Sequence, residues 1–297
     1  MALAGALTLD HVAHFVPDMD AASAALEKLG FTLTPFSAQS HRLQPGGPLS
    51  SAGTGNRCVM LDDGYLEFLT PTGRTPVAAE LRGAIARYVG VHLIAFGTRA
   101  AEGDHARLVA EGFEPTPAVA LERPISTETG EGTARFTVVR VPPGTMAEGR
   151  IQFCQHHTPE LVWQERWCDH RNGAVGLAGV LVCVEDPEET AKRYGRFTGL
   201  TPRPEANAWT LRTARGTLTF GSADAFRRTL DVDAPQRPWI AGYALETRKL
   251  ARARDHLARA GFEVKLLPRD RFVVMLPPEL GGVIVFQPPG STPLNLD

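Results

Sequence analysis

The order of apolar and polar positions repeats four times along the chain. Each copy begins with a short apolar run, continues with an Ala-rich stretch typical of a helix, and ends at a glycine. A glycine at this point favours the end of a helix, because the residue after the last turn often adopts a left-handed conformation. The four copies cover residues 9–31, 91–113, 179–200 and 242–262. Their stop glycines are Gly30, Gly112, Gly199 and Gly261.

Extended segments follow each predicted helix, separated by turn signals such as Asp62-Asp63-Gly64. Each copy therefore predicts a strand, a helix and three further strands, a βαβββ unit. Four units predict an α+β fold in which curved mixed sheets enclose a cleft in each of two paired halves. We expect an N-terminal half at residues 1–167 and a C-terminal half at 174–297, divided within the polar stretch 167–173.

Composition narrows the classes of function. The 297 residues are 43% hydrophobic and 22% charged, as in a globular protein, and the net charge of −2 comes from interspersed residues without a basic stripe. We therefore expect no nucleic-acid partner. Four scattered cysteines without a CxxC pair indicate a reducing compartment and disfavour structural zinc. No apolar run of about 18 residues predicts a membrane span, and no basic segment precedes the first apolar run, so we expect a cytoplasmic protein.

The first unit opens with the sequence LDHV and closes with GYLEFLTP. With its repeat, the chain resembles the vicinal oxygen chelate superfamily, and within it the glyoxalase-like domain group. That superfamily includes glyoxalase I, extradiol ring-cleaving dioxygenases, epimerases and drug-binding resistance proteins. The resemblance implies that side chains on the first and fourth strands of the units hold a divalent metal.

Transferring that pattern gives candidate ligands only in the N-terminal half. The first-strand positions are His11, 19 residues before its stop glycine, and His92, 20 residues before its own. The fourth-strand positions are Glu67 and Gln152, from the alignment of LEFL with IQFC. In the C-terminal half, the first-strand positions are Gly179 in the third unit and Ala241 or Gly242 in the fourth. The fourth-strand positions are Thr219 and Val285. We expect that half to be structural, with its cleft filled by side chains such as Val285 and Phe286.

Two imidazoles, a carboxylate and an amide oxygen suit iron, manganese, nickel or zinc, with positions left open for a bidentate substrate. A charge within YLEFL needs an explanation, and metal binding provides one for Glu67. The alternatives are an exposed edge-strand face for Glu67 and hydrogen-bonded strand positions for the histidines. Gln152 is equally well interpreted as a hydrogen-bonding residue.

Other polar residues are weaker candidates for substrate binding. His41 and Arg57 lie in or beside a long Gly/Ser/Pro-rich segment at residues 36–56. His156 has the strand parity of Gln152, whereas His14 should point away from His11. Arg99 and Arg123 in the second unit are lower-grade candidates, for which a solvated surface position is the preferred interpretation.

Two functions follow. The first is a metal-dependent enzyme, of the lyase, isomerase or ring-cleaving dioxygenase type, for a small substrate with vicinal oxygens. Glu67 is then both ligand and sole candidate base, because Gln152 stands where glyoxalase I-like enzymes usually carry a glutamate base. The second is a metal-free protein that sequesters a small molecule, of the bleomycin-resistance type. Either is expected as a monomer or a homodimer.

Overall fold

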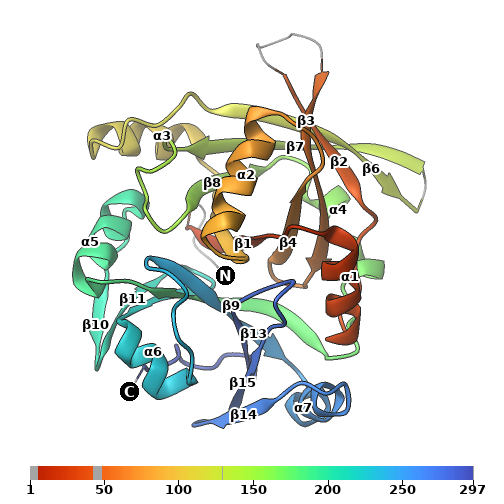
Figure 1. Ribbon diagram of the computed structural model, residues 1–297. Coiled ribbons are helices and arrows are strands. Elements are labelled where there is room, and N and C mark those ends of the chain that lie inside the picture. Colours follow the sequence, from red (N-terminus) through yellow and green to blue (C-terminus); the bar gives the residue numbers. More distant parts are fainter. Residues whose placement is uncertain (1–5, 43–48, 129, 297) are drawn as a thin grey trace.

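The computed structural model describes residues 6–42, 49–128 and 130–296. They form four consecutive βαβββ units, as the sequence predicts (Figure 1). Unit 1 comprises β1 (Thr8–Phe15), α1 (Met19–Lys28), β2 (Ser37–Arg42), β3 (Leu49–Met60) and β4 (Tyr65–Pro71). Unit 2 comprises β5 (Gly90–Gly97), α3 (Ala101–Ala110), β6 (Val119–Thr127), β7 (Gly130–Arg140) and β8 (Arg150–His156). Unit 3 comprises β9 (Ala174–Cys183), α5 (Pro187–Thr198), β10 (Arg203–Glu205), β11 (Ala208–Arg212) and β12 (Thr217–Gly221). Unit 4 comprises β13 (Trp239–Thr247), α7 (Leu250–Arg259), β14 (Val264–Leu267), β15 (Arg271–Met275) and β16 (Val283–Gln287).

Helices that the repeat pattern did not predict connect the units. They are α2 (Pro76–Arg87), α4 (Pro159–Val162), the 3-10 helix η1 (Glu165–Trp167) and α6 (Ala223–Leu230). Local sequence explains their starts: the Thr75 side chain accepts a hydrogen bond from Ala78 N at the start of α2, and Ser222 caps α6 in the same way. No helix in the described part of the chain is long and apolar enough to span a membrane.

Strand pairing is the same in every unit: the first strand lies parallel to the fourth, which pairs with the third, and the third with the second. Strand β1 pairs antiparallel with β5 to join units 1 and 2, and β9 pairs antiparallel with β13 to join units 3 and 4. Strands β5 and β13 meet at Val91 and Ile240, which connects the halves. Figure 1 shows units 1 and 2 in the upper part of the molecule and units 3 and 4 below.

The two faces of the N-terminal sheet differ in character. Val12 and Phe68 point to one face, where they join a core that also contains Val180 and Tyr243 of the C-terminal half. Alternation along β1 places His11 on the other face, which we call the His11 face. Helix α2 covers one end of the His11 face, where Leu81 packs in the same cluster as Ala13 and Phe15.

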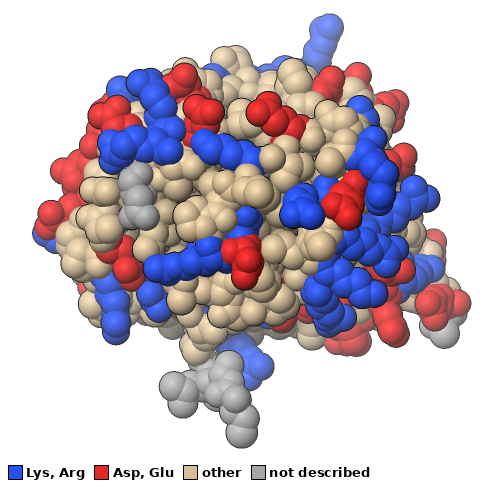
Figure 2. Space-filling model, turned by 90° about the horizontal axis from the view of Figure 1, so that it is seen from below, with Lys and Arg blue, Asp and Glu red and all other residues tan. Residues whose placement is uncertain are grey.

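The halves are joined by polar contacts as well as by the core. The backbone of Asp63 bonds to Val175 and Leu177 on β9, and its carboxylate pairs with Arg215 at 2.9 Å. Strand β8 ends at His156 and β9 begins at Ala174, so the proposed boundary at 167–174 lies in the connection between these strands. Figure 2 shows acidic and basic side chains side by side on the face seen from below, in keeping with the small net charge.

The inner face of the C-terminal sheet is apolar around Val285 and polar further along β16, where the buried Gln287 Oε1 accepts from Arg271 Nε at 3.0 Å. Val285 packs there with Leu181 and Ala244, and the last residues of the chain, including Leu294, fill the space beside them. A cavity of about 30 Å³ remains. The expectation for Phe286 is wrong, because it is adjacent to Val285 and therefore points to the opposite face, into the core shared by the halves.

His14 has the opposite orientation from His11, as expected, and contributes to the contact between the halves. Its ring is fully buried; Nδ1 donates to Leu280 O at 2.9 Å, and Nε2 accepts from the Tyr243 hydroxyl at 3.2 Å. Burial lowers the pKa of His14 to about 4, with a further contribution from nearby His92. The neutral imidazole is therefore the form that the folded protein holds.

We predict that His14 makes the protein less stable in mild acid. Because the pKa of His14 is lower in the folded state than the ordinary 6.5, the unfolded chain binds a proton first, so stability falls as the pH is lowered from 6.5 to 4. The loss from His14 should be on the order of 2–3 kcal/mol across that window. Urea unfolding of wild type and His14→Gln at pH 7.5 and 4.5 checks this. The variant should be less stable at pH 7.5 and lose less on acidification; an equal loss in both proteins would contradict the assignment.

Candidate functional site

The polar residues of the His11 face are ordered by strand register. His11 lies beside Tyr65 on β4 and Ala95 on β5, and Gln152 on β8 lies beside Ala95. Glu67 lies beside Ala13 on β1 and Cys58 on β3. The side chains of His11, Glu67 and Gln152 therefore belong to one face, as the sequence predicted for them. Each is largely buried: the exposed fractions are 3% for His11 and 8% for Gln152, and Glu67 is half-buried.

A bulge places Asp10 in this group. The register of β1 against β5 shifts between Leu9 and His11, so Asp10 is an extra residue in β1. Its carboxylate is buried, and Oδ2 accepts from His11 Nδ1 at 2.6 Å and from His156 Nε2 at 3.1 Å. One carboxylate oxygen thus binds two imidazoles from the two units of the half.

Electrostatics keep Asp10 ionised. Burial alone would raise the pKa of Asp10, but the hydrogen bonds and charges of His11 and His156 together outweigh it and hold the pKa well below its ordinary range. An ionised carboxylate can only accept, so His11 must carry its proton on Nδ1 and His156 on Nε2. His11 Nε2 is left with its lone pair, while the ring stacks on Tyr65 at 4.3 Å between centroids. His156 Nδ1 is enclosed without a partner.

Glu67 is oriented by a side chain of the adjacent strand. Asn56 Nδ2 donates to Glu67 Oε1 at 2.5 Å, which leaves Oε2 for another partner. Two cysteines lie near this group, Cys58 beside Glu67 on β3 and Cys154 two residues after Gln152. Burial raises the pKa of Cys58 to about 12 and that of Cys154 well above its ordinary value, so both are neutral thiols and poor nucleophiles.

His92 is not brought to the other candidates. The register pairs His11 with Ala95 and Ala13 with Leu93, then shifts, so that His92 is an extra residue in β5. Its Nε2 donates to Tyr88 O at 2.8 Å, and its ring stacks on Tyr88 and on Phe15. Phe15 is four residues from His11, roughly 13 Å along an extended strand.

The expected equivalence of His11 and His92 is therefore wrong by one residue. The sequence contains a sign of this difference: the histidine lies 19 residues before the stop glycine in one unit and 20 in the other.

The remaining candidates differ in position. His156 belongs to the group through Asp10. Arg57 points to the opposite face, where Nη1 donates to Ser23 Oγ on α1 at 3.3 Å. His41 lies on β2, but its side chain is outside the described part of the structure. Asp10 was not recognised in the sequence, although it stands directly before His11 in LDHV.

Aromatic side chains surround His156. Trp163, from the connection between the halves, contacts the edges of both His156 and Tyr65, at 4.9 and 5.8 Å between centroids. Phe136 on β7 contacts His156 at 5.0 Å. The polar group thus lies against an apolar wall that limits access of water.

One set of possible metal-binding atoms within 4.8 Å of one another occurs among the His, Cys, Asp and Glu side chains of the described residues. It comprises Asp10, Cys154 and His156. Asp10 and His156 already bind each other, and Cys154 is a neutral thiol, so a metal here would have to displace both the hydrogen bond and the thiol proton.

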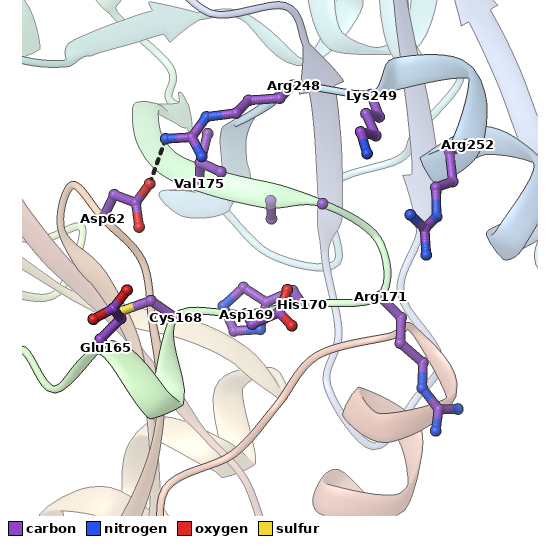
Figure 3. Close-up of a pocket in the computed structure, with 12 residues that line it drawn as sticks. Asp62, Glu165, Cys168, Asp169, His170, Arg171, Val175, Arg248, Lys249 and Arg252 are labelled. Atoms are coloured by element: carbon purple, nitrogen blue, oxygen red, sulfur yellow. Dashed lines mark hydrogen bonds and ion pairs between the residues drawn. The ribbon is translucent and has the colours of Figure 1, made fainter.

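A cavity of about 300 Å³ lies elsewhere, between the connection at residues 165–175 and the start of α7 (Figure 3). Arg248 in its wall pairs with Asp62 at 2.8 Å. His170 accepts from Thr32 N and donates to Met60 O, so neither ring nitrogen is available. We therefore assign chemistry to the group on the His11 face and not to this cavity.

A family model described as a glyoxalase-like domain matches residues 9–198. The chain belongs to this family. No curated protein matches the sequence.

Solved structures share the fold at low identity. A hypothetical protein from Staphylococcus aureus has a TM-score of 0.64 at 12% identity, covering 95% of this chain and 99% of its own. A mutant 4-hydroxymandelate synthase from Streptomyces coelicolor has 0.58 at 15%, covering 98% and 95%. The Mn(II)-bound glyoxalase from Novosphingobium aromaticivorans has 0.55 at 11%, covering 95% and 82%. The fold is therefore that of glyoxalases and of this synthase.

Replacing Asp10 by Asn should destabilise the protein and free both imidazoles. Because the pKa of Asp10 lies below its ordinary 3.8, its stabilisation is complete above that pH and is lost only as the pH falls further. At pH 7 we expect Asp10→Asn to cost about 1–3 kcal/mol of unfolding free energy. Nitrogen-15 NMR of the imidazoles should show His11 protonated on Nδ1 in wild type and a mixture of tautomers in the variant.

Asp104→Asn is the matched control, since Asp104 is a buried carboxylate paired with Arg107 on α3. It should lower stability without changing the His11 signals. An unchanged His11 tautomer in Asp10→Asn would contradict the proposed orientation.

Proposed function

We propose that the protein is an enzyme for a small molecule with adjacent oxygens, and that His11, Glu67 and Gln152 hold a divalent metal to which that substrate binds. The main support is the hydrogen bond from His11 Nδ1 to the buried Asp10 carboxylate. Metal-binding histidines usually donate their second ring nitrogen to such a partner, which fixes the ring and leaves the other nitrogen for the metal.

The residues present suit a divalent metal. Glu67 has the same kind of support as His11, because Asn56 binds one carboxylate oxygen and leaves the other. Gln152 contributes an amide oxygen from the same row of the sheet as His11. One imidazole, one carboxylate and one amide suit iron, manganese, nickel or zinc and leave positions open for substrate. His92 is not part of this set, because its ring is bound to Tyr88 at the far end of the face.

A bound divalent metal would supply Lewis acidity, polarising the two substrate oxygens. The remaining chemistry belongs to the chain. Glu67 would serve both as ligand and as base: Oε2 would have to leave the metal to accept a substrate proton, while Asn56 holds Oε1 and so fixes the direction of the carboxylate. Gln152 cannot accept a proton, so the face has a single base at the fourth-strand positions. Trp163 and Phe136 reduce the access of water to this group.

The relatives support the same class of reaction without identifying one. The family is described as glyoxalase-like, and the structures of similar fold include a Mn(II)-bound glyoxalase and a 4-hydroxymandelate synthase. We propose a lyase, an isomerase or an oxygenase acting on a small molecule, with no nucleic-acid partner.

A second candidate is a metal-free protein that sequesters a small molecule. The aromatic wall of Tyr65, Trp163 and Phe136 favours this function, because such side chains bind flat apolar ligands without a metal. Metal analysis distinguishes the two candidates.

We expect the purified protein to bind one divalent metal per chain, and we expect Glu67→Gln and His11→Phe each to lower metal affinity by at least ~10-fold. Gln152→Glu should raise it, because a carboxylate replaces an amide. His92→Gln is the control and should leave the affinity unchanged. Elemental analysis after dialysis against Mn(II), followed by titration, measures each value. A wild-type protein that binds no divalent metal would exclude the metal-dependent enzyme and leave the sequestering protein.

A further inference from the structure

We infer that Arg123 binds a carboxylate of the substrate, and therefore that the substrate is an organic acid with adjacent oxygens, such as a 2-hydroxy or 2-oxo acid. This inference rests on the proposed function for its location, but it concerns a residue that the metal does not require. Its basis is the position of a cation on the inner side of β6 that makes no ion-pair contact with a carboxylate of the described residues.

Strand β6 alternates regularly between half-buried and exposed residues, and Arg123 is on the half-buried side. The register places it beside Ala134 on β7, a fully buried small side chain over which the longer Arg123 can extend. The guanidinium lies over the Phe136 ring, 5.6 Å from its centroid, which orients it by a cation–π contact.

No charged side chain of the described residues contacts the Arg123 guanidinium. The guanidinium lies beside the Cys58 thiol, but burial raises the pKa of that thiol to about 12, so it is uncharged. The charge of Glu67 favours the charged form of Arg123 and contributes to its raised pKa, but no carboxylate of the described residues lies within 4.0 Å of the guanidinium, and Nε is enclosed without an acceptor. Its neighbour Glu122 pairs instead with Arg135 on the exposed side. The charged guanidinium therefore has a donor left for a bound anion.

Two chains of contacts connect Arg123 to the polar residues of the His11 face. Cys58 is the neighbour of Glu67 across β3 and β4. Phe136 contacts His156, which binds Asp10. A substrate whose reacting oxygens bind at the proposed metal site would therefore be able to place a carboxylate on Arg123. A carboxylate matches the planar, forked donors of arginine, and its single charge is tolerated better than that of a phosphate beside Asp10 and Glu67.

The test compares two probes that differ at one terminal carbon, which is a carboxylate in the first and a neutral hydroxymethyl group in the second. 3-Phenyllactate and 3-phenylpropane-1,2-diol have the same carbon skeleton and adjacent oxygens, but only the first has a carboxylate. We expect wild type to bind the acid at least ~10-fold more tightly than the diol in a titration followed by NMR. The Arg123 Nε–H signal should shift with the acid and not with the diol, which tests the contact without any substitution.

Three variants separate binding from structure. Arg123→Gln should lose the preference for the acid and keep its affinity for the diol, whereas Arg123→Lys should keep part of the preference. Arg135→Gln, which removes the same charge from the exposed side of the neighbouring strand, should behave as wild type. Equal affinity of wild type for both probes, or an equal loss of preference in Arg135→Gln, would overturn the assignment.

The titrations are repeated in EDTA and with Mn(II). A preference for the acid that depends on Arg123 in both conditions supports this inference. If no metal binds in the same experiment, that result contradicts only the proposed function. A shift of the Arg123 signal that is the same for acid and diol would contradict this inference and leave the metal site intact.

Discussion

The antiparallel pairing of β1 with β5 determines what the N-terminal half can do. These strands are the first strands of their units, and each contains one extra residue relative to its partner. The extra residue in β1 is Asp10, whose carboxylate thereby reaches the imidazole of its own neighbour, His11, and that of His156. The extra residue in β5 is His92, which turns toward Tyr88 and away from the group. Two small irregularities in one ladder thus add one polar residue to the site and remove another.

Much of the architecture could be predicted from the sequence, because it depends on periodicity. The four units followed from apolar runs, helical stretches and stop glycines, and period-two alternation placed His11, Glu67 and Gln152 on one face. His92 could not be placed correctly, since a bulge changes strand parity by one residue and leaves only a one-residue difference in spacing as a sign. Arg123 could be ranked only as a weak candidate, with a surface position preferred, because the face of β6 that turns inward depends on its pairing with β7, a contact that no local pattern specifies.

The two halves use the same framework in different ways. In units 1 and 2 the fourth-strand positions carry Glu67 and Gln152, and buried polar atoms are oriented by neighbours such as Asn56. In units 3 and 4 the corresponding positions carry Thr219 and Val285, and the end of the chain fills the space with apolar side chains. Burying apolar surface stabilises a fold, whereas an arranged set of buried polar groups adds little or costs free energy. We therefore expect the C-terminal half to contribute more to stability than the N-terminal half, whose buried polar groups form the candidate site.

The apolar core runs without interruption from one half into the other. Phe68 and Val12 of the first sheet belong to the same cluster as Val180 and Tyr243 of the second. Neither half can open without exposing the apolar face of its partner, so the chain should behave as a single cooperative unit of folding despite its fourfold internal repetition. For a protein assembled from similar modules, this has an evolutionary consequence. Because the loss of either half would expose the shared core of the other, we expect the half that lacks the candidate site residues to be retained.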